Sequence, residues 1–127
     1  MTIIGLGIDI LKIKRIKNIV NKFGHKFSKK ILSKKELKKL LTIKKKTNFI
    51  AKKFSVKESI SKALGTGFRN KIKFTSFEIL HDKLGKPYVK LLNKAKIFAF
   101  QLNLKSIHIS ITDEKKYICS VAILEKK

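Results

Sequence analysis

Three charged side chains in this sequence have the types and the spacing needed to hold a phosphorylated ligand. Glu58 and Lys62 lie four residues apart in the segment 54–63, so on an α-helix they share one face. Asp9 follows the apolar segment 3–8, which has two glycines and is typical of a strand. Two carboxylates and one ammonium that converge would suit a divalent cation together with a phosphorylated ligand.

Each of these features also has a plainer interpretation, and the residues alone leave both open. Glu58 and Lys62 could form an ordinary surface ion pair on a helix, and Asp9 could cap the helix that follows it. Gly65, which begins a Gly-Thr-Gly turn, could end a helix or could bring backbone amides close to phosphate oxygens. His108 could face solvent or contact a phosphate.

Hydrophobic periodicity and capping residues predict the elements that position this site. Ser33 followed by Glu36 predicts a capping box at the start of a helix. Thr47 and Asn93 are the expected N-caps of two later helices. Expected strands cover 2–9, 74–80, 88–92, 107–112 and 117–124, and expected helices cover 10–20, 27–32, 34–41, 47–64 and 93–100. This order predicts an α+β fold, with a mostly antiparallel sheet packed against a long helix.

The overall composition predicts a single domain, residues 1–127. The chain of 127 residues is 43% hydrophobic, which is enough to form a core. No apolar run reaches the roughly 18 residues that a membrane span needs, and the N-terminus lacks the layout of a secretion signal. Cys119 is the single cysteine, so an internal disulfide is impossible and a reducing, cytoplasmic location is expected.

The formal net charge of +24 predicts attraction to polyanions. A non-enzymatic nucleic-acid-binding domain is therefore the rival hypothesis, and its affinity would fall steeply with salt. However, Arg15 and Arg69 are the only arginines, whereas proteins that contact base edges favour arginine over lysine. A membrane-surface protein is a weaker alternative, because no expected helix pairs a broad apolar face with clustered aromatic anchors. We expect no nucleic acid as a functional partner.

Five short segments follow one another in an order that a known family shares. They are Gly5-Leu6-Gly7-Ile8-Asp9-Ile10 followed by Arg15, Phe54-Ser55-Val56-Lys57-Glu58 through Lys62-Ala63, Gly65-Thr66-Gly67, Asp82-Lys83-Leu84-Gly85-Lys86-Pro87, and His108-Ile109-Ser110. Together they resemble the motifs of holo-acyl-carrier-protein synthases, which are small 4'-phosphopantetheinyl transferases. The resemblance covers nearly the whole chain.

The resemblance implies the 4'-phosphopantetheinyl transferase fold, an activity and a metal. Family members transfer 4'-phosphopantetheine from coenzyme A to a serine of apo acyl carrier protein, release adenosine 3',5'-bisphosphate and support fatty acid biosynthesis. By this resemblance, Asp9 and Glu58 hold Mg²⁺ together with the coenzyme A diphosphate, and Lys62 adds positive charge beside that diphosphate. Either a metal-bound water or Glu58 could accept the serine proton.

The resemblance also implies binding residues and an assembly. Lys53 and His108 match positions that contact phosphates of coenzyme A, and Gly65 lies in the adjoining turn. Relatives often have arginine where Lys53 stands, and many have a second histidine where Asp113 stands. Arg15 matches the residue that meets the acidic recognition helix of acyl carrier protein. Family members of this length form homotrimers that bind coenzyme A in the clefts between subunits.

Overall fold

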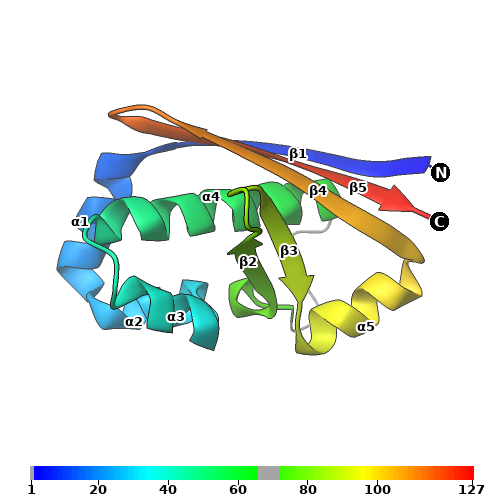
Figure 1. Ribbon diagram of the computed structural model, residues 1–127, viewed down its shortest axis with the longest axis horizontal. Helices are drawn as coiled ribbons and strands as arrows, with labels where there is room; N and C mark the ends of the chain where they lie inside the picture. The colour runs from blue at the N-terminus through cyan, green and yellow to red at the C-terminus, as the bar shows by residue number, and fades with distance from the viewer. Residues whose placement is uncertain (1, 66–71) are drawn as a thin grey trace.

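The computed structural model describes residues 2–65 and 72–127 (Figure 1). Within these ranges the chain forms two sheets, five α-helices and one short 3₁₀ helix, η1 (Phe74–Ser76). The helices are α1 (Ile13–Phe23), α2 (His25–Ile31), α3 (Lys34–Leu40), α4 (Lys46–Leu64) and α5 (Asn93–Gln101). The strands are β1 (Thr2–Lys12), β2 (Phe77–His81), β3 (Pro87–Leu91), β4 (Leu104–Asp113) and β5 (Tyr117–Lys126).

Both sheets are antiparallel, and the longest helix runs along the larger one. The larger sheet has the strand order β1-β5-β4, and β2 and β3 form a hairpin. α4 extends along the inner face of the larger sheet, whereas α2 and α3 lie on the side of α4 away from that sheet (Figure 1). The expected α+β architecture is confirmed.

The core consists of two clusters of buried apolar side chains, and α4 contributes to both. One cluster contains Val56 and Ile60 of α4 with Leu124 of β5. The other contains Ile50 of α4 with Ile118 of β5. Because α4 contacts sheet, hairpin and helices, its position determines where its polar side chains emerge.

The first strand is longer than expected, and the first helix begins later. Ile10 pairs with Cys119 and Leu11 pairs with Ile118 in the β1-β5 ladder, so the helix starts only at Ile13. The expected helix over residues 10–20 was therefore placed too early. Ile10 misled the periodicity because it is an apolar strand residue whose side chain is 70% exposed, not part of a helical stripe.

One of the three expected N-caps is confirmed. Ser33 Oγ accepts a hydrogen bond from the Glu36 amide, and Glu36 Oε1 accepts one from the Ser33 amide, which completes the capping box. The predictions for Thr47 and Asn93 are wrong, because both residues lie inside their helices and neither helix has a side-chain cap. At α4, the Lys46 ammonium instead binds two carbonyl groups of the preceding turn.

Of two further boundaries, the start of β2 differs from the expectation and the end of α4 agrees with it. The strand expected from residue 74 begins only at Phe77, because Phe74–Ser76 form a 3₁₀ turn. Gly65 ends α4 with a left-handed φ of 78°, as expected, and the rest of the Gly-Thr-Gly turn lies outside the described residues. Among the described helices, none has the length and apolarity to cross a membrane.

Candidate active site

Two glycines let β1 lie directly on α4. A Cβ atom added to Gly7 would lie 1.9 Å from the backbone oxygen of Ser59, and one added to Gly5 would lie 1.9 Å from that of Ala63. Any larger residue would push the strand away from the helix. This contact brings Asp9, two residues after Gly7, to the side of α4 that carries Glu58 and Lys62.

Asp9 is held by two side chains of α4. Ser55 Oγ donates a hydrogen bond of 2.8 Å to Asp9 Oδ2. The Lys62 ammonium lies 3.5 Å from Asp9 Oδ1 and donates a bond of 3.0 Å to the Ile8 carbonyl. The Asp9 side chain is 13% exposed, whereas that of Lys62 is 54% exposed. The ion-pair partner of Lys62 is therefore Asp9 of β1, and not Glu58 one turn away on the same helix.

Glu58 is partly buried near the same carboxylate. Burial raises its pKa first, and the negative charge of Asp9 raises it further, while Lys62 and Arg15 partly offset both effects. Among the described residues, Glu58 has no hydrogen-bond or ion-pair partner. Two neighbouring carboxylates that repel each other are a donor pair that could hold a divalent cation.

The described residues contain no group of three or more histidine, cysteine or acidic side chains placed to hold a metal. Mg²⁺ can be held by only one or two protein carboxylates, because it takes its other ligands from phosphate oxygens and water. Arg15, exposed on α1, lies close enough to Glu58 to influence its charge. Asp9, Glu58, Lys62 and Arg15 thus gather in one region of the molecule.

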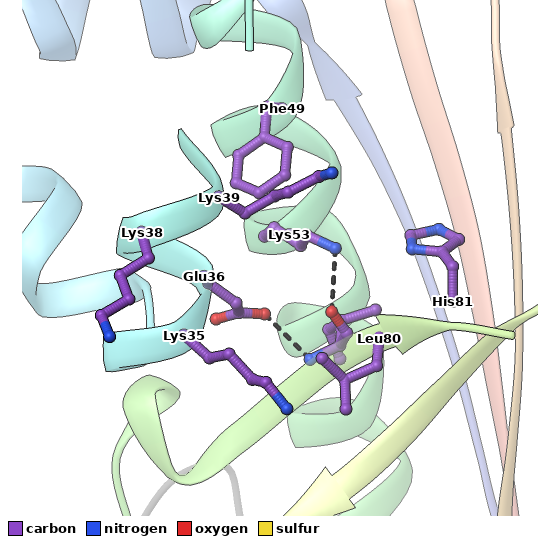
Figure 2. Close-up of a pocket in the computed structure, with 9 residues that line it drawn as sticks. Lys35, Glu36, Lys38, Lys39, Phe49, Lys53, Leu80 and His81 are labelled. Carbon is purple, nitrogen blue, oxygen red and sulfur yellow. Dashed lines mark hydrogen bonds between the residues drawn. The ribbon is translucent and has the colours of Figure 1, made fainter. Parts of the chain in front are cut away.

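Lys53 lies away from this group. Its ammonium donates a hydrogen bond of 3.0 Å to the Ile79 carbonyl of β2, on another side of α4, and lies 5.0 Å from the centre of the Phe49 ring. There it lines a cavity of about 490 Å³ between α3, α4 and β2, whose rim also carries Lys38 and His81 (Figure 2). Burial lowers the pKa of Lys53 to about 8, although Glu36 partly offsets this effect.

His108 also lies outside the Asp9 group. It projects from the outer face of β4, opposite the isoleucines, as the alternation indicated. His108 Nε2 lies 2.5 Å from Glu125 Oε1 of the neighbouring strand and 3.1 Å from Ser106 Oγ. Gly65 is exposed at the end of α4. Within one chain, therefore, the fold does not bring Lys53 or His108 to Asp9.

Sequence reasoning missed a buried ion pair. Lys57 Nζ lies 2.6 Å from Glu36 Oε1 and donates a bond of 2.6 Å to the Ile31 carbonyl, while Glu36 Oε2 accepts a bond of 2.9 Å from the Ile79 amide. Both side chains of the pair are at most 1% exposed. Nothing in the spacing of residues 36 and 57 predicts this contact. The pair joins α3 and α4 to β2 and thereby fixes the helix that carries the site.

Comparison with known proteins identifies the family. The model of the 4'-phosphopantetheinyl transferase superfamily matches residues 5–122. The chain is 55% identical over 127 residues to the holo-[acyl-carrier-protein] synthase of Buchnera aphidicola subsp. Baizongia pistaciae, with 98% of this chain and 99% of the relative covered.

Solved structures agree with this match. The fold is similar to that of holo-[acyl-carrier-protein] synthase from Neisseria meningitidis, with a TM-score of 0.95, 34% identity and coverage of 98% of this chain and 100% of the other. The Helicobacter pylori enzyme in complex with coenzyme A gives a TM-score of 0.82 at 30% identity, over 94% and 99% of the two chains. The chain therefore belongs to the 4'-phosphopantetheinyl transferase superfamily, and within it to the holo-[acyl-carrier-protein] synthases.

Proposed function

We propose that Asp9, Glu58 and Lys62 form the site at which this chain transfers 4'-phosphopantetheine from coenzyme A to a serine of apo acyl carrier protein. Adenosine 3',5'-bisphosphate is the other product of this reaction. The observation that carries the proposal is that Asp9 of β1 lies against α4, bonded to Ser55 and 3.5 Å from Lys62, where its charge also acts on Glu58. The coenzyme A bound to the similar H. pylori enzyme supports the choice of co-substrate.

The two carboxylates fit Mg²⁺, and we propose that they hold it. Hard oxygen ligands suit this ion, and a divalent charge would offset both the burial and the repulsion from Asp9 that raise the pKa of Glu58. When bound with coenzyme A, Mg²⁺ would neutralise charge on the diphosphate and polarise the phosphorus under attack. Lys62, tethered to Asp9 and the Ile8 carbonyl, would hold its ammonium beside the same diphosphate.

Arg15 supports a docking role for the same region. Its guanidinium is exposed on α1 and lies near Glu58, so an acidic carrier protein bound there would present its serine to the site. The net charge of +24 would steer such a partner toward the enzyme. We also propose a cytoplasmic location in fatty acid biosynthesis, which the free thiol of Cys119 supports.

Assembly would explain the separation of His108 from Asp9. We propose a homotrimer in which His108 contacts coenzyme A phosphates bound to a neighbouring subunit. The support is the outer face of the larger sheet, which carries exposed apolar side chains on β1 and, beyond β5, His108 on β4. A sheet face of this kind favours contact with another copy.

The decisive experiment is modification of purified apo acyl carrier protein, followed by mass spectrometry. A mass gain should require both coenzyme A and Mg²⁺. Asp9→Asn and Glu58→Gln should each lower the rate roughly a hundredfold or more, because even partners of metal ligands cost about 10- to 100-fold when removed. Glu114→Gln, which neutralises an exposed carboxylate in the β4-β5 turn, is the matched control and should retain full activity. Full activity in both site variants would show that the cluster is not the active site.

A further inference from the structure

Three buried serine hydroxyls form a continuous chain that ends on Asp9. Ser59 Oγ lies 2.6 Å from Ser120 Oγ, Ser120 Oγ lies 2.8 Å from Ser55 Oγ, and Ser55 Oγ lies 2.8 Å from Asp9 Oδ2. The exposed fractions of Ser55 and Ser59 are 0%, and that of Ser120 is 2%. Ser55 and Ser59 lie one turn apart on α4, and Ser120 pairs with Asp9 in the β1-β5 ladder.

The direction of the two hydrogen bonds nearest Asp9 follows from counting protons. An ionised carboxylate only accepts, and a serine hydroxyl has one proton to donate. Ser55 therefore donates to Asp9 and must accept from Ser120. The proton of Ser120 is used on Ser55, so Ser59 can donate either to Ser120 Oγ at 2.6 Å or to the Ser120 carbonyl at 3.2 Å. The O–H bonds of Ser120 and Ser55 both point toward Asp9, so the first polarises the second and strengthens it.

This arrangement distinguishes the two oxygens of Asp9. Oδ2 is occupied by the serine chain, whereas Oδ1 faces Lys62 at 3.5 Å on the more open side. A carboxylate can rotate about its Cβ–Cγ bond, and that freedom is lost when one oxygen is held from a buried position. If Oδ1 binds a cation, it would then be oriented before the cation and coenzyme A arrive.

We propose that Ser55 is a positioning residue for the Asp9 carboxylate, and that Ser120 and Ser59 support it through the ordered hydroxyl chain. The consequence is a tighter divalent-cation site. This inference rests on the proposed role of Asp9 as a metal ligand. It adds the residues that orient this ligand.

Direct metal binding tests the proposal. Mn²⁺ is titrated into purified enzyme with coenzyme A and followed by electron paramagnetic resonance, and the Mg²⁺ concentration for half-maximal transfer is measured in parallel. Ser55→Ala should weaken Mn²⁺ binding and raise the Mg²⁺ requirement roughly three- to tenfold, since a hydrogen bond to a charged group is lost. The rate at saturating Mg²⁺ should stay within about twofold of the wild type.

The loss of metal affinity should decrease with distance from Asp9 along the hydroxyl chain, and this order is the more specific test of the proposal. Ser120→Ala should have a smaller effect than Ser55→Ala, and Ser59→Ala the smallest. Ser61→Ala, on the same helix but outside the chain, should leave metal binding unchanged. Thermal unfolding of each variant separates loss of stability from loss of metal affinity. Lower stability with wild-type metal affinity in Ser55→Ala and Ser120→Ala would overturn the proposal and leave the serines a purely structural role.

Asp9→Asn separates this inference from the proposed function. If Asp9→Asn leaves Mn²⁺ binding unchanged, Asp9 is not the metal ligand and the proposed site itself fails. If Asp9→Asn abolishes binding while Ser55→Ala has no effect, the site stands and the positioning role alone is wrong.

Discussion

At the scale of single residues, the lysines of α4 show how strongly environment changes one side-chain type. Lys52 forms an exposed ion pair with Asp113 at 3.3 Å, a contact that contributes little to stability. Lys57 is fully buried against Glu36, and its removal would leave that carboxylate buried without a compensating charge. Lys53 is buried with a carbonyl partner instead of a carboxylate, so burial lowers its pKa to about 8. Lysine content alone therefore says little about what each lysine does.

Because its pKa is lowered, Lys53 should make the folded protein more stable as the pH rises into the alkaline range. In the folded chain the pKa of Lys53 is about 8, against 10.5 for an ordinary lysine, so between these pH values the unfolded chain binds more protons. Stability then rises with pH at this position. Relative to Lys53→Met, the wild type should gain about 2 kcal/mol of unfolding free energy between neutral pH and about pH 10.

Urea unfolding of both proteins across this pH range measures the difference. Lys38→Met, which removes an exposed lysine from the rim of the same cavity, should follow the wild type with a constant offset. A constant offset for Lys53→Met as well would mean that Lys53 keeps an ordinary pKa in the folded protein.

At the scale of elements, the site depends on how closely a strand approaches a helix. β1 contributes Asp9, and α4 contributes Glu58, Lys62 and Ser55. The two elements meet through backbone atoms because Gly5 and Gly7 have no side chain to separate them. The approach of Asp9 to Glu58 thus depends on two glycines that have no side chain of their own to contribute to the site.

Gly7→Ala should disrupt this contact. The new Cβ would lie 1.9 Å from the Ser59 carbonyl oxygen, a backbone atom of α4 that cannot turn aside. We expect a loss of roughly 3 kcal/mol or more of stability, as in severe overpacking, together with loss of Mn²⁺ binding as Asp9 moves away from α4. Chemical denaturation and metal titration measure the two effects.

Gly85→Ala is the comparison variant for this prediction. Gly85 has a positive φ of 87° but open space around it, so the substitution introduces backbone strain without a steric clash. It should cost only about 1 kcal/mol and leave metal binding intact. Equal losses in both variants would mean that close packing of β1 on α4 is unimportant.

At the scale of the whole molecule, one face of the larger sheet has no covering layer in the described structure. α4 covers the inner face, whereas Leu6, Ile8 and Ile10 of β1 point outward and are 66%, 63% and 70% exposed. Val121 and Ile123 of β5 lie beside them in register. Such a continuous apolar surface on so charged a protein favours association with further copies.

Ile8→Asp should therefore dissociate the proposed homotrimer. A carboxylate on the apolar face would lose its hydration on assembly without gaining a partner there. Light scattering coupled to size-exclusion chromatography should give the mass of a trimer for the wild type and a smaller mass for Ile8→Asp. Tyr88→Asp, which changes an exposed aromatic residue of the β2-β3 hairpin, should leave the assembly intact. A monomeric wild type would refute the trimer directly.

Local patterns were sufficient for most elements and for the type of fold. The capping box at Ser33, the helix end at Gly65 and the alternation around His108 were predicted correctly because each depends on residues within a few positions of one another. The start of α1 was not, since Ile10 and Leu11 are held in β1 by pairing with residues more than a hundred positions away. The predicted N-caps at Thr47 and Asn93 were wrong because residue type favours a cap only where the residue directly precedes the helix, and both residues lie inside their helices.

Local sequence was enough to find the residue types that can bind a cation and phosphate, and the helical spacing that puts Glu58 and Lys62 on one face. The partners of these residues depend on the tertiary fold. It paired Lys62 with Asp9, buried Lys57 against Glu36 and joined the serines of α4 and β5 beneath Asp9. The physical reason is that helical spacing operates over a few residues, whereas hydrogen bonds and burial depend on which distant segments the core brings together.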